Sequence, residues 1–253
     1  MAFDVPSAAY QRFMGEFSDV LAGPFADYVG VAPGSATRVL DVGCGPGALT
    51  AELVSRLSAS HIAAVDPSVP FVAAARKRLP EIDVREGAAE NLPFESDTFD
   101  AAMAQLVVLF MKDQAAGLSE MARVTRPGGV VAVSSWDHAS GRGPLTKFWT
   151  AVRELWPQDR DVDERGMPAE ALANLLAGAG LRDIEVTDLT AIRRYETFEE
   201  WWEPHTLGVG PVGDYYCALD EDQRAALRAK AAETTPEIPF TVEAVATAAR
   251  GIR

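Results

Sequence analysis

Cysteine and histidine are both scarce in this chain of 253 residues. Two cysteines are present, Cys44 and Cys217, and they are too few for a disulfide framework or a cysteine zinc site. The three histidines do not combine with acidic residues at the spacing of metal ligands. We therefore expect reduced thiols and no bound metal.

Long hydrophobic runs and an excess of basic residues are absent as well. No stretch of 18 apolar residues occurs, and residues 1–13 show neither the basic start nor the apolar core of a secretory signal. This pattern predicts a cytoplasmic protein without membrane insertion. The 37 acidic residues outnumber the 23 basic ones and give a net charge of −14, which repels a phosphate backbone. No nucleic-acid partner is expected.

The most informative segment is VLDVGCGPG at residues 39–47. An apolar run ends at Asp41, and the chain then turns through three glycines into a stretch with helical spacing. Glycines allow backbone angles that other residues avoid, and they let a ligand approach the main chain closely. About 20 residues later a second apolar run ends at Asp66, where α/β nucleotide-binding folds bind a ribose. Together these features predict a nucleotide-type site.

Short apolar runs alternate with helical patterns from residue 37 to residue 136. Such alternation predicts a single α/β domain over residues 1–253, with a parallel sheet, helices on both faces and the ligand at the carboxyl ends of the strands. Two later segments also have strand composition. The expected strands are 38–42, 61–65, 82–85, 99–106, 129–136, 181–192 and 239–251, and the expected helices of the core are 47–57, 68–78 and 113–124.

The glycine turn resembles motif I of the class I S-adenosylmethionine (SAM)-dependent methyltransferases, since an acidic residue precedes the glycines and Pro46 lies among them. VDPS (65–68) is similar to the second motif of that family, residues 88–108 to its third and fourth, and RPGG (126–129) to its turn before the fifth strand. The resemblance implies a Rossmann-like, mostly parallel seven-stranded sheet of order 3-2-1-4-5-7-6 with an antiparallel seventh strand. It also implies SAM as cofactor and S-adenosylhomocysteine (SAH) as product.

The same resemblance assigns cofactor-binding residues within a core of residues 37–136. Gly43, Cys44 and Gly45 would line the cofactor through their backbone, because side chains at the glycines would occupy its volume. Asp66 is expected to accept hydrogen bonds from both ribose hydroxyls. Asp41 is expected to accept them from turn amides or, through water, from the cofactor's ammonium. The remaining expected contacts are Pro67, Ala88, Ala89 and Glu90 at the adenine and Gln105 on the sulfonium side.

Position 88 departs from the family pattern. Many relatives carry Asp there and bind the exocyclic amine of the adenine with it, whereas this chain has Ala88. A backbone group or Glu90 would then have to make that contact.

An N-terminal helical cap, residues 1–36, is expected at the cofactor end. Residues 7–30 have helical spacing, and YQRFMGEF (10–17) resembles the opening of one actinobacterial-type subgroup. By that resemblance, Tyr10, Phe13 and Met14 would touch the cofactor. Packing of one helix face on the core explains the same periodicity.

The substrate-side half, residues 137–253, contains an insertion at 195–238 that is rich in aromatic residues and glycines. Long connections in compact domains are usually functional or disordered, and the aromatics argue against disorder. We interpret the insertion as a lid over the substrate. Trp201 and Trp202 could instead serve only to dock the insertion on the sheet, since large aromatics are mostly buried.

Histidine is the natural base if the methyl acceptor must lose a proton. His138 follows the fifth expected strand at its carboxyl end, and His205 lies in the expected lid. Each is a candidate base or substrate-positioning residue, with polar packing as the alternative. His61 opens the second strand at the opposite end, so it is expected to be structural.

The predicted function is methyl transfer from SAM to O, N or C of a small molecule. The apolar, aromatic lid favours a lipophilic or aromatic acceptor. A protein methyltransferase and a non-catalytic protein that binds SAM or SAH are the alternatives. The proline in the glycine turn and the motifs after it oppose an NAD-dependent oxidoreductase. We expect a monomer or homodimer.

Overall fold

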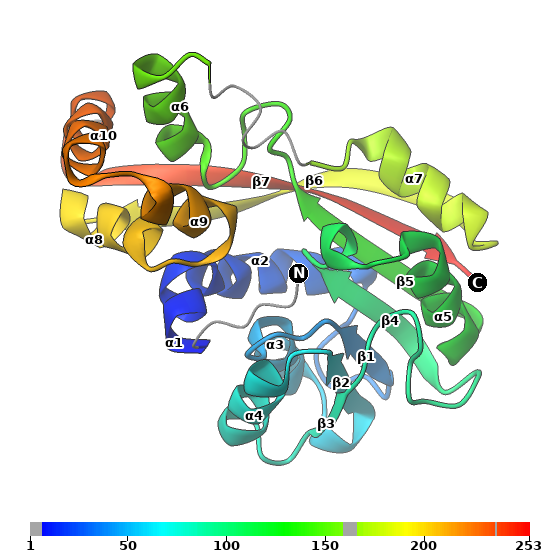
Figure 1. Ribbon diagram of the computed structural model, residues 1–253. Coiled ribbons are helices and arrows are strands. Elements are labelled where there is room, and N and C mark those ends of the chain that lie inside the picture. The colour runs from blue at the N-terminus through cyan, green and yellow to red at the C-terminus, as the bar shows by residue number, and fades with distance from the viewer. Residues whose placement is uncertain (1–6, 159–165, 236) are drawn as a thin grey trace.

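The computed structural model describes residues 7–158, 166–235 and 237–253, and it has one seven-stranded sheet of order β3-β2-β1-β4-β5-β7-β6 (Figure 1). Strands β1 to β5 are parallel, and β7 is antiparallel to both β5 and β6. The fold class and strand order predicted from the sequence are confirmed. The strands are β1 (Val39–Val42), β2 (Ile62–Asp66), β3 (Asp83–Glu86), β4 (Phe99–Gln105), β5 (Thr125–Trp136), β6 (Arg182–Tyr195) and β7 (Phe240–Ile252).

Helices cover both faces of the sheet and bury a hydrophobic core on each. On one face α2, α3 and α4 pack on alternate residues of the central strands, and on the other face α5 and α7 do so. The α-helices are α1 (Ser7–Tyr10), α2 (Glu16–Val29), α3 (Ala48–Arg56), α4 (Val69–Arg78), α5 (Gln114–Val124), α6 (Thr146–Leu155), α7 (Ala169–Gly178), α8 (Phe198–Trp202), α9 (Gly210–Ala218) and α10 (Glu221–Thr234). No helix in these described ranges is long and apolar enough to cross a membrane.

Strand β5 begins four residues before the predicted position 129. Thr125 pairs with Phe99, and the ladder then resumes at Val130 opposite Ala101, so RPGG (126–129) forms a bulge within the strand. A Cβ on Gly129 would come within 2.6 Å of the carbonyl oxygen of Asp100, which explains the glycine at this close approach. The predicted turn is therefore an irregularity inside a longer strand.

A third hydrophobic core lies between the N-terminal helices and the β6–β7 pair, at the end where β6 finishes and β7 begins. In Figure 1, α8, α9 and α10 gather over one end of this strand pair, together with α6. Large aromatic side chains fill the core, and Trp201 and Trp202 are only 2% and 4% exposed. We call this set the aromatic cluster; its aromatic members are Phe13, Phe17, Trp136, Phe148, Trp149, Tyr195, Phe198, Trp201, Trp202 and Phe240.

The cap and lid expected from the sequence correspond to this third core. The described part of the cap consists of α1, a π-helical turn at Gln11–Gly15 and α2, and residues 1–6 lie outside the described residues. The insertion folds into α8, a 3-10 turn at Glu203–Thr206, α9 and α10, with residue 236 likewise outside them. An ion pair between Arg12 and Glu203 ties the two segments together at 2.9 Å. The cap and the insertion thus pack on each other.

Candidate cofactor and methyl-transfer site

The glycine turn between β1 and α3 is fixed against the end of β2. The backbone amides of Gly43 and Cys44 donate to the carbonyl oxygen of Val65 at 2.7 and 3.0 Å. Gly43, Gly45 and Gly47 have φ angles of +72°, +54° and +93°, in the region that favours glycine. Glycine is therefore needed at all three positions, because a residue with a Cβ would be strained there.

Two glycines of this turn have different surroundings. A Cβ on Gly43 would come within 2.5 Å of Cγ1 of Val107, which follows β4. At Gly45 the same atom would meet nothing within 4 Å. Gly43 therefore allows two loops to pack closely, whereas Gly45 borders open space at the carboxyl edge of the sheet.

Asp66 lies at the end of β2 and is 6% exposed. Its Oδ2 accepts a hydrogen bond from the amide of Gly45 and its Oδ1 one from the amide of Ser68, both at 2.8 Å. Burial raises the pKa of this carboxyl group, and the two amides act in the opposite direction. A carboxylate has about four lone-pair sites, so two amides leave acceptor capacity for ligand hydroxyls.

Asp41 is buried at the end of β1 and accepts a hydrogen bond from the hydroxyl of Thr50 at 2.6 Å. Of the turn amides expected to donate to it, those of Gly43 and Cys44 donate to the carbonyl oxygen of Val65 and that of Gly45 donates to Asp66. The pKa of Asp41 is raised to about 7: burial raises it most, the hydroxyl and the backbone amide of Thr50 oppose this, and the negative charge of Asp66 adds to the rise. Thr50 was missed in the sequence analysis, because the first turn of α3 gave no sign that it faces Asp41.

Gln105 ends β4 and is 9% exposed. Its Nε2 donates to the carbonyl oxygen of Ser18 in α2 at 2.9 Å, and its Oε1 is buried without a partner among the described residues. The following residue, Leu106, has a φ of +63°, a strained backbone conformation for leucine. Because Val107 touches Gly43, this segment lies beside the glycine turn, and the amide oxygen of Gln105 is an unused acceptor close to it.

The N-terminal helices connect the cofactor edge to the aromatic cluster. The ring of Tyr10 lies 5.1 Å from that of Phe71 in the first turn of α4, and burial raises the pKa of Tyr10 to about 12. The ring of Phe13 lies 5.7 Å from that of His205, and Met14 packs against the same cluster. Both interpretations of this helix are therefore compatible with the contacts, since its residues reach the cofactor edge and also pack on a core.

The residues expected at the adenine lie at the same edge. Pro67 is exposed after β2, Ala88 is half-buried after β3, and Ala89 is buried. The carboxylate of Glu90 accepts hydrogen bonds from the amides of Lys112 and Asp113 at 2.6 and 3.2 Å, just before α5. Both amides donate to Oε1 of Glu90, so its other oxygen retains acceptor capacity, and Glu90 and the backbone groups near Ala88 both stay candidates for contacting the adenine amine.

His205 is buried at 5% exposure, and its ring is stacked on that of Phe148 at 5.3 Å. Its Nδ1 lies 2.8 Å from the carbonyl oxygen of Trp201. Since a carbonyl only accepts, Nδ1 carries the proton and Nε2 keeps its lone pair. Burial lowers the pKa of His205 to about 4, so the ring is neutral near pH 7.

His138 follows β5 at the carboxyl edge, as expected, and burial also lowers its pKa to about 4. A Cβ on Gly143 would come within 2.3 Å of its Nδ1, so this glycine allows the loop to pack on the ring. The neighbouring Asp137 is paired with Arg142 at 2.5 Å. Within the described ranges, no three histidine, cysteine or acidic side chains are grouped to hold a metal.

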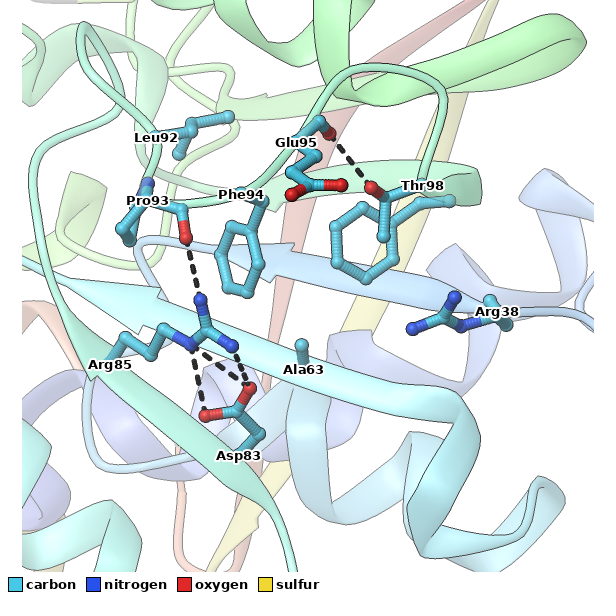
Figure 2. A pocket seen from close by; sticks show the side chains of 10 residues that line it. Arg38, Ala63, Asp83, Arg85, Leu92, Pro93, Phe94, Glu95 and Thr98 are labelled. Carbon is cyan, nitrogen blue, oxygen red and sulfur yellow. Dashed lines mark hydrogen bonds and ion pairs between the residues drawn. The ribbon is translucent and has the colours of Figure 1, made fainter.

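His61 lies at the start of β2, far from the carboxyl edge, and its Nδ1 is buried without a partner among the described side chains and backbone groups. A pocket of about 690 Å³ opens at this same amino edge of the sheet (Figure 2). Arg85 lines it, held by Asp83 at 2.7 Å and by the carbonyl oxygen of Pro93 at 2.6 Å, with Phe94 under its guanidinium. Ligands of open parallel sheets bind at the other edge, so we do not assign the cofactor to this pocket.

Comparison with known proteins gives a consistent result for the core. Residues 40–133 match the sequence model of the methyltransferase domain family. A demethylmenaquinone methyltransferase from Mycobacterium sp. (strain KMS) is 37% identical over 130 residues, which are 51% of this chain and 54% of the relative. A malonyl-[acyl-carrier protein] O-methyltransferase from Salmonella typhimurium is 34% identical over 140 residues, 55% of this chain and 53% of the relative. The chain thus spans about half the length of these curated relatives.

The structural similarity to known proteins covers more of the chain than the sequence similarity does. The crystal structure of a SAM-dependent methyltransferase from Thermotoga maritima matches with a TM-score of 0.55 at 19% identity, and the match covers 96% of this chain and 94% of the other. At that identity the match shows the fold alone. Residues 40–133 therefore belong to the methyltransferase domain family, in a chain that has the fold of the class I SAM-dependent methyltransferases.

Proposed function

We propose that this protein transfers a methyl group from SAM to O, N or C of a small lipophilic or aromatic molecule. The observation that carries the proposal is the open space beside Gly45, bordered by the carboxylate of Asp66. The two curated relatives named above are small-molecule and carrier-bound acyl methyltransferases, respectively, and the shared segment is the half that binds the cofactor in such folds.

The residues at this edge fit SAM in shape and in charge. Gly45 leaves room where a side chain would obstruct the ligand, and Asp66 retains capacity to accept hydrogen bonds from ribose hydroxyls. Asp41 and Asp66 make the edge acidic, which suits a ligand with a sulfonium and an ammonium. The same acidity would repel the pyrophosphate of a nicotinamide cofactor.

When bound, SAM supplies a methyl group that is already activated by its positive sulfur. The protein then has mainly to bind and align the two reactants. The carbonyl oxygen of Ser18 orients the amide of Gln105, whose buried oxygen can accept a hydrogen bond at the transfer site. His205, neutral and with a lone pair on Nε2, can accept a proton or a hydrogen bond from an acceptor inside the aromatic cluster.

Aromatic side chains on the substrate side support an apolar acceptor. The aromatic cluster brings α6, α8 and the cap together, so a molecule that reaches it between cap and lid would meet mainly aromatic rings, with the exposed Arg12–Glu203 pair as a charged contact between the two segments. Flat apolar molecules gain most from such contacts. A small-molecule acceptor therefore agrees better with this side of the protein than a basic peptide does.

Calorimetric titration with SAM and SAH tests the cofactor half of the proposal, with NADH as the control ligand. We expect micromolar binding of the first two and none of NADH. Asp66→Asn should weaken SAH binding about 10- to 100-fold, the value of one or two hydrogen bonds to a charged group. Glu81→Gln, a matched change at an exposed position, should bind as the wild type does. If the wild type binds neither SAM nor SAH, the proposal fails.

Methyl transfer itself is tested with SAM carrying a labelled methyl group. We expect label in small lipophilic products when the protein is supplied with an extract of cell lipids and aromatic metabolites. Label on protein instead would support a protein methyltransferase. Binding of SAM without any transfer would favour a non-catalytic SAM-binding protein.

A further inference from the structure

Asp41 and Thr50 form a buried pair next to the proposed cofactor site. The two side chains are 1% and 0% exposed, and the hydroxyl of Thr50 donates to Oδ2 of Asp41. Beside Asp41 in the sheet lie Ala64 on β2 and Met103 on β4, both apolar. Thr50 is therefore a polar group placed in this apolar setting to meet the carboxyl group.

Asp66 is the titratable group that acts on Asp41 from a neighbouring element, since this acidic residue of β2 disfavours a second negative charge. Cys44 in the glycine turn is affected in its turn: burial, Asp41 and Asp66 raise the pKa of its thiol well above the usual range. Burial, too, disfavours the carboxylate form of Asp41. Only Thr50, through its hydroxyl and its backbone amide, favours the charged form.

A positively charged ligand changes this balance. The amino-acid part of SAM and of SAH carries an ammonium, and a carboxylate attracts it whereas a protonated carboxyl group does not. Resting on the function proposed above, we infer that Thr50 is a positioning residue that favours the carboxylate form of Asp41. The cofactor's ammonium then completes the ionisation, and the fraction of Asp41 that is still protonated releases its proton when the cofactor binds. No covalent step is involved, and the proton passes to the solvent.

The size of the effect follows from the titration of Asp41. With a pKa of about 7 for the free protein, the carboxylate fraction is about ten times larger at pH 8 than at pH 6. SAH should therefore bind about tenfold more tightly at pH 8 than at pH 6. The pKa values of His138 and His205, both about 4, keep these groups neutral over that range.

Replacement of Thr50 separates this role from simple packing. Thr50→Val keeps the shape of the side chain but removes the hydroxyl, and loss of one hydrogen bond to a carboxylate moves the midpoint of the pH dependence to about pH 8. SAH binding at pH 7 should then fall about fivefold, while the two proteins converge at pH 8.5. Thr50→Ser retains the hydroxyl and should behave as the wild type does.

A ligand without the amino-acid part supplies the second control. 5′-Methylthioadenosine has the ribose and adenine of SAH but no ammonium, so its affinity should be the same at pH 6 and pH 8 in all three proteins. This ligand also reports whether the Thr50→Val site is intact. Unchanged binding of it by the variant would show that the SAH effect does not come from a damaged fold.

The decisive measurement is calorimetry of SAH binding at pH 7 in phosphate and in Tris, whose ionisation enthalpies differ, which counts the protons released. We expect release of about half a proton by the wild type and more by Thr50→Val. Equal SAH affinity at pH 6 and pH 8 without proton release, or a Thr50→Val profile identical to that of the wild type, would overturn the inference and leave SAM binding standing. Failure of the wild type to bind SAH at any pH would overturn the proposed function as well.

Discussion

Gly43 and Gly45 stand two residues apart in one turn, yet an added methyl group would meet different surroundings at each. At Gly43 it would come within 2.5 and 2.6 Å of the two γ-carbons of Val107, and at Gly45 it would reach open space. Both positions have a positive φ. The two alanine variants therefore share the backbone strain and differ in the clash.

The magnitudes follow from these two contributions. Left-handed backbone costs a non-glycine residue about 1–2 kcal/mol, so Gly45→Ala should lower the free energy of unfolding by about that amount. Overpacking adds about 1–3 kcal/mol, so Gly43→Ala should lose about 2–5 kcal/mol. The affinity for SAH should show the opposite order. Relative to the stability that each variant loses, Gly45→Ala should weaken SAH binding more than Gly43→Ala does, because only the methyl group at Gly45 occupies the space assigned to the cofactor.

Urea unfolding and calorimetric titration with SAH measure the two effects separately. A third protein, Gly43→Ala with Val107→Ala, removes the γ-carbons and should recover the overpacking part, which would appear as a favourable coupling energy of about 1–3 kcal/mol. The reasoning would be refuted if Gly43→Ala were as stable as Gly45→Ala, or if Gly45→Ala bound SAH as tightly as the wild type.

Two further predictions concern stability. Burial holds the folded-state pKa of His205 at about 4, below the value of about 6.5 expected for the unfolded chain, so stability is fully present above pH 6.5 and is lost as the pH falls toward 4. Between pH 7 and pH 4 the wild type should lose about 3 kcal/mol more than His205→Phe in urea unfolding, and parallel curves would contradict this. Arg56, whose side chain is 10% exposed, pairs with Asp27 and Glu52 and donates to the carbonyl oxygens of Gly23 and Val31. Arg56→Met should cost about 2–4 kcal/mol, whereas Arg228→Met, which breaks an exposed pair with Glu199, should cost under about 1 kcal/mol; equal losses would count against it.

The cofactor half of the fold could be predicted from the sequence because its signals are local. An apolar run followed at once by a glycine turn places Asp41 and the turn together, and the second run places Asp66 on the neighbouring strand. The register of β1 and β2, with Asp41 opposite Ala64, confirms that arrangement. The start of β5 was predicted too late, because pairing of Thr125 with Phe99 resumes across a bulge that no periodicity reveals.

Side-chain partners could not be predicted in the same way. Nothing in the sequence shows that Thr50 turns toward Asp41, that Glu90 bonds to the amides before α5, or that Gln105 is held by Ser18, 87 positions away. The aromatic insertion is a similar case. Aromatic residues that pack on each other and aromatic residues that line a ligand site give a segment the same amino-acid composition, so the sequence does not distinguish the two roles. The structure shows that Trp201 and Trp202 are packed on their neighbours, and the lid stays a prediction.

The aromatic cluster also fixes where the protein's own fluorescence originates. All five tryptophans belong to it or pack against it: Trp136, Trp149, Trp156, Trp201 and Trp202. The glycine turn and the strands β1 to β4 contain no indole, so emission reports on the end of β5, on α6 and the residue after it, and on the insertion, whereas circular dichroism averages over the whole sheet. Comparing the two signals during unfolding would show, without any label, whether the cluster melts together with the sheet or as a separate cooperative unit.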